Sequence, residues 1–378
     1  MHLSIGLELN TKNAEFLSNM RRRHFRGFSP SSVGILRDRT LYKMPVKLSF
    51  VIPLYNTADY ISQCISSIVQ NTADKSLYEI IVVDDGSTDS SARIVEGLCE
   101  KFTNISLICE QNHGVSAARM TGVSKAKGDY IWFIDSDDYL TPNATCHVLS
   151  WIEKYPNISA FVTPMLYSFD IDHSKDFVSP VVDRQISVTG KELLKGKNLF
   201  LVGPPHFIFR RSLFLDNSLY FPKNVRNEDE YFSRVLKYRA QSILILKQAL
   251  YIYRQWSGSH MNSITMDNAT DIITVYKHLD NFASNEVDVE DQSWFREDIV
   301  FFLLESITRF RSQIGTIQFY SFKKTYHEYF VTEWRKYQHY FSWKNRVLGN
   351  LLLVSPRFYF FILDTYDRLK LYVKQIKR

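Results

Sequence analysis

The chain has 378 residues, of which 45% are hydrophobic and 15% aromatic, and its formal net charge is +6. These proportions exclude a disordered chain, and the length is sufficient for one large α/β domain with a smaller appendage. Residues 1–47 and residues 343–378 each have a net charge of +6, so the residues between them have a net charge of −6. The acidic middle section argues against nucleic acid as a partner, because it would repel a phosphate backbone.

Four cysteines occur in the first half of the chain: Cys64, Cys99, Cys109 and Cys146. They form no CxxC pair and have no metal-ligand spacing, and no signal peptide precedes them. We therefore expect reduced thiols in a cytoplasmic protein. Cys64 falls in an apolar series at helical spacing over residues 61–69, which predicts a helix with Cys64 in the core.

Four short apolar runs alternate with stretches of helical periodicity: residues 48–52, 80–83, 105–109 and 130–134. Runs of this length between helical stretches are typical of buried parallel strands. The alternation predicts an α/β fold in which a mostly parallel sheet has helices on both faces.

Acid-rich or polar loops follow three of these runs: Pro53–Asn56, Asp84–Asp89 and Asp135–Asp138. Because ligands of open α/β sheets bind beyond the carboxyl ends of the strands, we expect these loops to form one site. The last loop holds three carboxylates in four residues, an arrangement that a hard cation such as Mg²⁺ or Mn²⁺ would stabilise. The alternative for these residues is a simple turn or helix cap.

The loop after the second run has two readings. Gly86 permits a tight turn, and the neighbouring carboxylates can accept hydrogen bonds from a base or ribose. Alternatively, Ser87 or Thr88 caps the helix that begins near Asp89. Tyr55, after the first run, could stack on a nucleobase or pack at the strand end.

Further elements are predicted after the third polar loop. Thr141 followed by Pro142 predicts the cap and first turn of a helix, and a strand is expected near residues 158–162. The polar stretch 170–189 is expected to be a mobile loop over the site.

Another helix is predicted to begin at Asn227, with Glu230 completing a capping box. From residue 266 onward the pattern is helical. No stretch reaches the roughly 20 apolar residues that cross a bilayer.

Together these features resemble bacterial glycosyltransferase family 2. The resemblance covers roughly residues 47–260. Its motifs occur in the family's order: SFVIPLYN (49–56), EIIVVDDGSTDSS (79–91), NHGVSAAR (112–119), KGDYIWFIDSDDYL (127–140) and NEDEYFSRVL (227–236). The resemblance implies the Rossmann-like GT-A fold and transfer of a sugar, with inversion, from a nucleotide-diphosphate sugar to a hydroxyl group.

The resemblance also assigns roles to single residues. Asp137 is implied as the principal ligand of Mn²⁺ or Mg²⁺, with Asp135 beside it. The candidate contacts to the donor's diphosphate are Asp138, Arg254 and His260. The residues implied to hold the nucleotide are Pro53, Tyr55, Asn56, Asp84, Asp85 and Asp135.

The family's catalytic acid pair corresponds to Glu228 and Asp229. We expect Asp229 to be the general base, with Glu228 as the alternative. Acids are favoured in any first helical turn, so helix capping alone could explain part of this pattern. Because a helix N-terminus lowers a carboxyl pKa, a base here would need burial to offset that effect.

Three parts of the chain are expected. Residues 1–43 match nothing in the resemblance and form an N-terminal extension, with Met44 as the expected natural start. Residues 44–265 form the catalytic domain, and residues 266–378 form a C-terminal helical region. Aromatic and basic residues alternate near the C-terminus, which suits either an anionic membrane surface or a helix packed on the catalytic domain.

These observations favour an enzyme at the inner face of the cell membrane. Its expected donor is a UDP-sugar, and its expected acceptor is a growing surface polysaccharide or lipid-linked saccharide. One alternative is a sugar nucleotidyltransferase, but no glycine-rich phosphate loop follows the first strand. Another is an inactive binding module with basic ends. A polymerising synthase is disfavoured because spanning helices and a QxxRW motif are missing.

Overall fold

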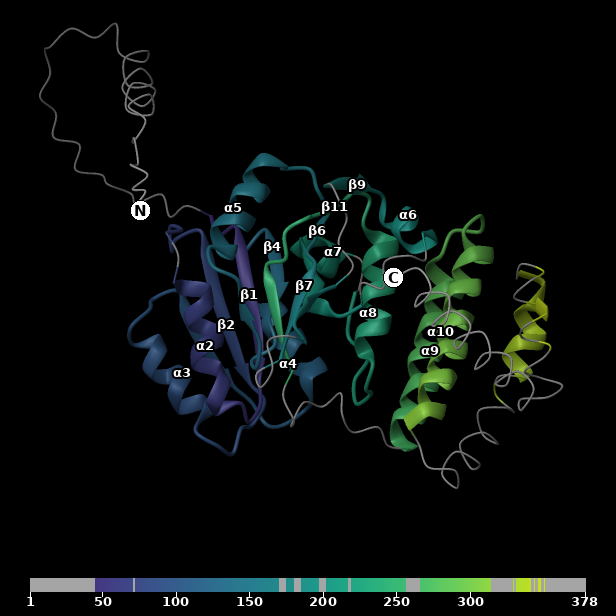
Figure 1. Ribbon diagram of the computed structural model, residues 1–378, viewed down its shortest axis with the longest axis horizontal. Coiled ribbons are helices and arrows are strands. Elements are labelled where there is room, and N and C mark those ends of the chain that lie inside the picture. Colours follow the sequence, from purple (N-terminus) through teal and green to yellow (C-terminus); the bar gives the residue numbers. More distant parts are fainter. Residues whose placement is uncertain are drawn as a thin grey trace, which may run out of the picture. The chain divides into compact units, whose positions relative to one another are not determined.

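A computed structural model describes the chain, which divides into two units, Met1–Lys43 and Met44–Arg378. All described residues belong to the second unit (Figure 1). They are residues 45–70, 72–169, 175–179, 185–196, 202–216, 219–255, 266–313, 329, 331–340, 343, 346–347 and 350. The predicted N-terminal extension, His260 and the aromatic and basic C-terminal residues lie outside this set.

The main sheet has eight strands in the order β3-β2-β1-β4-β10-β6-β11-β9. The strands β3, β2, β1 and β4 are parallel, as are β6 and β11, whereas β10 and β9 run antiparallel to their neighbours. Their bounds are β1 Leu48–Leu54, β2 Tyr78–Asp84, β3 Ile105–Cys109, β4 Tyr130–Phe133, β6 Ala160–Val162, β9 Ile186–Val188, β10 Phe207–Arg210 and β11 Ile243–Ile245. All five predicted strands are therefore confirmed.

A second sheet of four strands has the order β5-β12-β7-β8. Its strands are β5 Tyr139–Leu140, β7 Met165–Phe169, β8 Phe177–Val178 and β12 Tyr251–Gln255. β5 begins directly after the Asp135–Asp138 loop, so this sheet supports that loop. The sequence analysis missed these strands.

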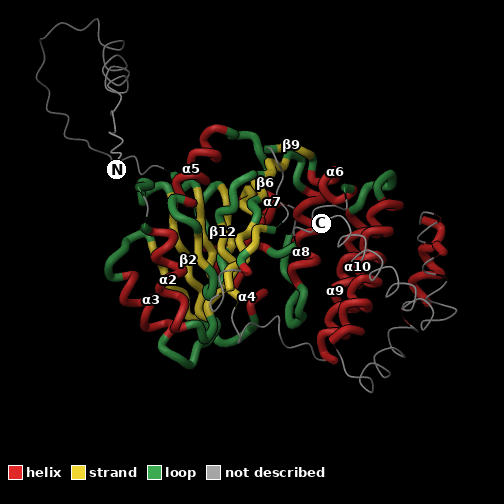
Figure 2. Tube along the Cα trace, viewed as in Figure 1, coloured by secondary structure: helices red, strands yellow, loops and turns green. Residues whose placement is uncertain are grey.

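The helices lie around the main sheet, as Figure 2 shows in red. Their bounds are α2 Ala58–Val69, α3 Ser91–Cys99, α4 Val115–Lys125, α5 Ala144–Lys154, α6 Gly190–Lys195, α7 Arg211–Asp216, α8 Glu228–Arg239, α9 Met266–Glu286 and α10 Gln292–Gln313. Two 3₁₀ turns span Pro204–His206 and Gln338–Tyr340. The predicted helical region after residue 266 is present in α9 and α10.

Alternating side chains of the strands fill two cores, one on each face of the main sheet. On one face Phe50 and Ile52 pack in a core with α2, in which Cys64 is fully buried, as predicted. On the other face Val51 belongs to a core that contains residues of α4, α8, α9 and α10. Helices therefore cover both faces, and the helices after residue 266 share a core with the sheet.

Two predicted helix caps are wrong. α5 begins after Asn143, which has a φ of 60° and no side-chain cap hydrogen bond, and the hydroxyl of Thr141 donates to backbone carbonyls of the β12 region instead. α8 begins after Asn227, which adopts the left-handed conformation and makes no capping box. Its expected partner Glu230 pairs with Arg234 one turn along α8. With this backbone conformation, the Asn227 side chain accepts no hydrogen bond from the N–H groups in the first turn of α8.

The stretch 170–189 is only partly described. It contains β8, β9 and Thr189, whose side chain and Glu192 form a capping box at the start of α6. Residues 170–174 and 180–184 lie outside the described part, so the expected mobile loop stays a prediction.

Among the described residues, no helix is long and apolar enough to cross a membrane.

The aromatic core beneath α8 leads to a stability prediction. Phe232 is fully buried, and its ring lies 4.4 Å from that of Phe221 and 5.6 Å from that of Phe209. Phe232→Ala should lower the free energy of unfolding by about 3–5 kcal/mol, because it leaves a cavity in a packed cluster. Chemical denaturation measures this loss. Phe301→Ala, at a 42% exposed position, is the control and should cost far less; equal losses would contradict the packing described here.

Candidate active site

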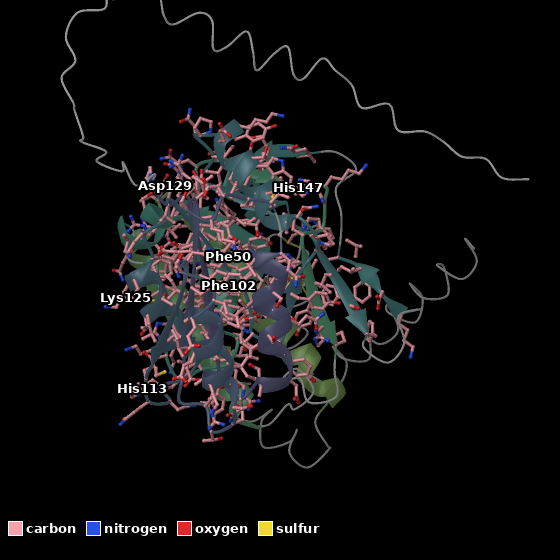
Figure 3. The ribbon with its side chains drawn as sticks, turned by 90° about the vertical axis from the view of Figure 1, so that its left-hand side faces the viewer. Phe50, Phe102, His113, Lys125, Asp129 and His147 are labelled. Atoms are coloured by element: carbon pink, nitrogen blue, oxygen red, sulfur yellow. The ribbon has the colours of Figure 1, made fainter. Side chains whose placement is uncertain are left out.

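The carboxyl ends of the parallel strands lie at one end of the sheet. Figure 3 labels Asp129, just before β4, at one end of the structure, and His113, which follows β3, at the other. The loops after β1, β2 and β4 lie at the end marked by His113, because these strands are parallel to β3 or to its parallel neighbours. The predicted gathering of acid-rich loops at one edge is therefore confirmed.

The loop after β1 is fastened to the loop after β2. Asn56 has a φ of 51°, and its side-chain oxygen accepts hydrogen bonds from the backbone N–H of Thr88 at 2.8 Å and of Asp89 at 3.4 Å. In return, the backbone N–H of Asn56 donates to Ser87. Asn56 thus holds the loops after β1 and β2 together. Tyr55 next to it is 45% exposed and free to stack on a ligand, whereas Pro53 is buried within β1.

The two aspartates at the end of β2 are buried and bind backbone amides. Asp85 accepts hydrogen bonds from the N–H groups of His113 at 2.7 Å and Gly114 at 2.9 Å. Asp84 accepts from the N–H of Ser87 at 3.3 Å. Asp85 therefore fixes the start of α4, where Gly114 adopts a φ of 86° that favours glycine.

The three carboxylates after β4 have different surroundings. Asp135 and Asp137 are partly exposed, whereas Asp138 is 1% exposed. Asp138 accepts hydrogen bonds from the Tyr251 hydroxyl at 2.6 Å and the Arg254 backbone N–H at 2.8 Å. Burial, with the nearby charges of Asp137 and Asp135, raises the pKa of Asp138 well above its usual range. Asp138 thus holds its loop onto β12 instead of facing a ligand.

Arg254 is also used inside the protein. Its Nε donates to the Asp137 carbonyl at 2.9 Å, and an Nη donates to Gln63 at 2.6 Å. The guanidinium lies about 5 Å from the ring centres of Tyr60 and Tyr139 (5.0 and 4.9 Å). Arg254 therefore holds the backbone of the Asp137 loop in place. His260 lies outside the described residues.

The third sequence motif contributes a residue that the sequence analysis did not single out. The guanidinium of Arg119, on α4, donates to Glu228 at 2.7 Å and to Asp135 at 3.0 Å. Arg119 is 5% exposed. Burial acts to lower its pKa, but the charges of Asp135 and Glu228 outweigh that effect, so the pKa is raised. The only signal in the sequence was its place in NHGVSAAR, since nothing there indicates which acids it contacts.

The acid pair starts α8, as predicted. Glu228 accepts a hydrogen bond from Arg119. Asp229 is half-buried. Burial, followed by the charges of Glu228 and Glu230, raises the pKa of Asp229 to about 8, although Arg119 acts in the opposite direction. Burial thus offsets the helix N-terminus, and a carboxyl group titrating near neutral pH suits a general base.

This pKa predicts a pH-dependent stability. Because the folded state raises the pKa of Asp229 from 3.8 to about 8, it favours the protonated form. The contribution of protonated Asp229 to the free energy of unfolding is fully present below about pH 4 and is lost as pH rises through about 8. Relative to wild type, Asp229→Asn should gain stability across this window, by at least ~2 °C in Tm. Thermal unfolding from pH 5 to 9 tests this, and a constant Tm difference would contradict the raised pKa.

The remaining question for the site is whether it can hold a cation. Within the part of the chain that the structure describes, no three or more His, Cys, Asp or Glu side chains are arranged to hold a metal ion. Asp135 and Asp137 nevertheless offer carboxylates at the open end of β4. Two carboxylates fit Mg²⁺ or Mn²⁺ bound with a nucleotide, because such ions take most of their other ligands from phosphates and water.

A mostly parallel sheet that gathers polar loops at its carboxyl edge is the arrangement in which open α/β proteins bind their ligands. Residues 49–216 match the family model described as glycosyl transferase family 2.

Curated relatives agree with the family. A poly(ribitol-phosphate) beta-glucosyltransferase of Bacillus spizizenii is 31% identical over 235 residues, which are 57% of this chain and 34% of the relative. The uncharacterized glycosyltransferase EpsJ of Bacillus subtilis is 30% identical, over 58% of this chain and 62% of the relative. The chain therefore spans less than two thirds of the length of these relatives.

A solved structure supports the fold. Staphylococcus aureus TarS 1–349, in complex with UDP-GlcNAc, superimposes with a TM-score of 0.54 at 20% identity, over 75% of this chain and 92% of that chain. The GT-A fold implied by the sequence resemblance is thereby confirmed.

Proposed function

We propose that this protein transfers a sugar from a nucleotide-diphosphate sugar to a hydroxyl group of a saccharide acceptor. One observation carries the proposal: Arg119 bridges Asp135, at the predicted metal and nucleotide end of β4, to Glu228, in the predicted catalytic pair. The carboxylates that we propose for the donor side and for the acceptor side both pair with this guanidinium. A catalyst of sugar transfer needs both groups within reach of one anomeric carbon.

We propose a UDP-sugar as donor. Tyr55 would stack on the base, with Pro53, Asn56, Asp84 and Asp85 shaping the pocket around it. The family relation supports this assignment, and the related TarS structure contains UDP-GlcNAc. Asp135 and Asp137 would hold Mn²⁺ or Mg²⁺, which, when bound, would neutralise charge on the departing nucleoside diphosphate.

In this reaction Asp229 would take the proton of the acceptor hydroxyl as that oxygen attacks the anomeric carbon. The bond to the diphosphate would break on the opposite side, so the anomeric configuration would invert. Asp138 and Arg254 would keep the Asp137 loop in place, and His260 stays a candidate contact to the diphosphate. Glu228, paired with Arg119, would orient the start of α8.

The proposed acceptor is a growing surface polysaccharide or lipid-linked saccharide at the inner face of the cell membrane. Similarity to an enzyme that glycosylates poly(ribitol phosphate) supports a polymer acceptor. The basic, aromatic C-terminal sequence supports a membrane surface. Flotation with anionic vesicles tests this location, and unchanged binding after deletion of residues 343–378 would exclude the C-terminal segment as the anchor.

The proposed function is tested by a thermal-shift screen of purified protein with nucleoside diphosphates and nucleotide sugars, each with Mn²⁺, with Mg²⁺ and with chelator. A ligand that binds only the folded state must raise Tm. We expect metal-dependent stabilisation by UDP and one or more UDP-sugars, followed by release of UDP on addition of acceptor. No shift with any nucleotide would contradict the function.

A further inference from the structure

Arg119 occupies a fixed position between three of the sequence motifs. It lies on α4, whose first turn is held by Asp85 through the N–H groups of His113 and Gly114. Ser116, also in the first turn of α4, donates a hydrogen bond of 2.8 Å to the Pro222 carbonyl, in the segment that leads to α8. The helix that carries Arg119 is therefore tied both to the nucleotide side and to the approach to α8.

The guanidinium itself is almost completely enclosed. Its planar face lies 5.2 Å from the ring centre of Phe221, and its two Nη atoms reach Asp135 and Glu228. Among the described residues, its Nε has no hydrogen-bond partner. A buried arginine that pairs with two carboxylates depends on both of them. Removal of one partner leaves a buried charge that is not compensated.

We propose that Arg119 is a positioning residue that sets Glu228, and through it the start of α8, against the donor end of β4. This inference rests on the proposed function. In it, Glu228 holds the helix and Asp229, the next residue, faces the acceptor. A lysine could not do the same, because its single ammonium lacks the planar fork that engages two carboxylates in fixed directions.

A pH profile separates this role from a purely structural one. The charged groups that face Asp229 are Glu228 and Glu230, which raise its pKa, and Arg119, which lowers it. Loss of the positive charge should raise the pKa of Asp229, so the ascending limb of kcat/KM should move to higher pH. A protein that was merely destabilised would lose active molecules without moving this limb.

The experiment uses the full chain with Arg119→Gln, Arg119→Lys and the control Arg210→Gln. Arg210 also binds through its guanidinium, but to backbone carbonyls near the amino end of β4. We expect Arg119→Gln to lower kcat/KM by about 10²-fold and to move the ascending limb upward. Arg119→Lys should lower kcat/KM with a smaller movement of the limb, and Arg210→Gln should leave the profile in place.

A double-mutant cycle with Glu228→Gln tests the contact directly. If Arg119 acts through Glu228, the double variant should lose little more than the worse single variant. Multiplicative losses, or an unmoved pH profile in Arg119→Gln, would overturn the proposal. A large loss of UDP–Mn²⁺ affinity in calorimetry would also overturn it, by making Arg119 a donor-binding residue.

Two controls keep the outcome interpretable. Wild-type protein that transfers no sugar contradicts the proposed function before Arg119 is tested. If Arg119→Gln fails to fold, judged by its thermal unfolding, Arg119→Lys carries the test: full activity with an unmoved profile in that variant would overturn the proposal.

Discussion

Asp229→Asn is expected to lower kcat for sugar transfer by about 10²–10⁴-fold, the usual contribution of a general base. The substitution keeps the size of the side chain but removes its ability to accept a proton. Because Asp229 lies at the start of α8 and not among the nucleotide-side loops, binding of UDP and metal should be nearly unchanged. Steady-state transfer and calorimetric titration with UDP–Mn²⁺ measure the two effects.

The matched comparison is Glu228→Gln. Glu228 is engaged by Arg119 at 2.7 Å, so its carboxylate is less available to an acceptor. We expect this variant to keep measurable transfer above that of Asp229→Asn. The reverse order, with Glu228→Gln inactive and Asp229→Asn active, would move the base to Glu228.

Asp137→Ala is expected to abolish the metal-dependent stabilisation of the protein by UDP. With ligand at 100 times its Kd, that stabilisation should be about 2.7 kcal/mol in wild type. The loss follows from removal of a carboxylate that is partly exposed at the carboxyl end of β4. Thermal shift with UDP, with and without Mn²⁺, gives the measurement.

Asp129→Ala is the control for this variant. Asp129 lies just before β4, at the opposite end of the sheet, and pairs with Lys47 on the surface (Figure 3). Its loss should leave the response to UDP–Mn²⁺ intact. If both variants respond like wild type, the cation lies elsewhere or plays no part in nucleotide binding.

The parallel part of the fold could be predicted from the sequence because the apolar runs of β1, β2 and β4 are buried almost throughout. The same runs located the polar loops, since parallel strands deliver their carboxyl ends to one edge. β10 could not be predicted in this way. It is a four-residue strand between a 3₁₀ turn and α7, and its pairing with β4 and β6 depends on distant residues.

The sequence predicted which residues belong to the site better than it predicted which of them contact one another. The sequence identified Asp135, Asp138 and Glu228 as candidates, but not that Asp138 turns inward to Tyr251 or that Glu228 meets Arg119. Those pairings join residues about a hundred positions apart in the chain, so local spacing carries no record of them. The capping box failed for a related reason, because the left-handed backbone at Asn227 is not visible in the residue type alone.

The helix of the acid pair, α8, packs against α9 and α10, the helices that follow it in the chain. Arg234 on α8 pairs with Asp298 on α10 at 2.8 Å, and the ring of Tyr238 lies 5.6 to 5.7 Å from those of Phe295 and Phe282 (Figure 1). The sheet and α8 consequently share one core with α9 and α10. A chimera that exchanges donor specificity would have to transplant α9 and α10 together with the sheet, or redesign the surface that they cover.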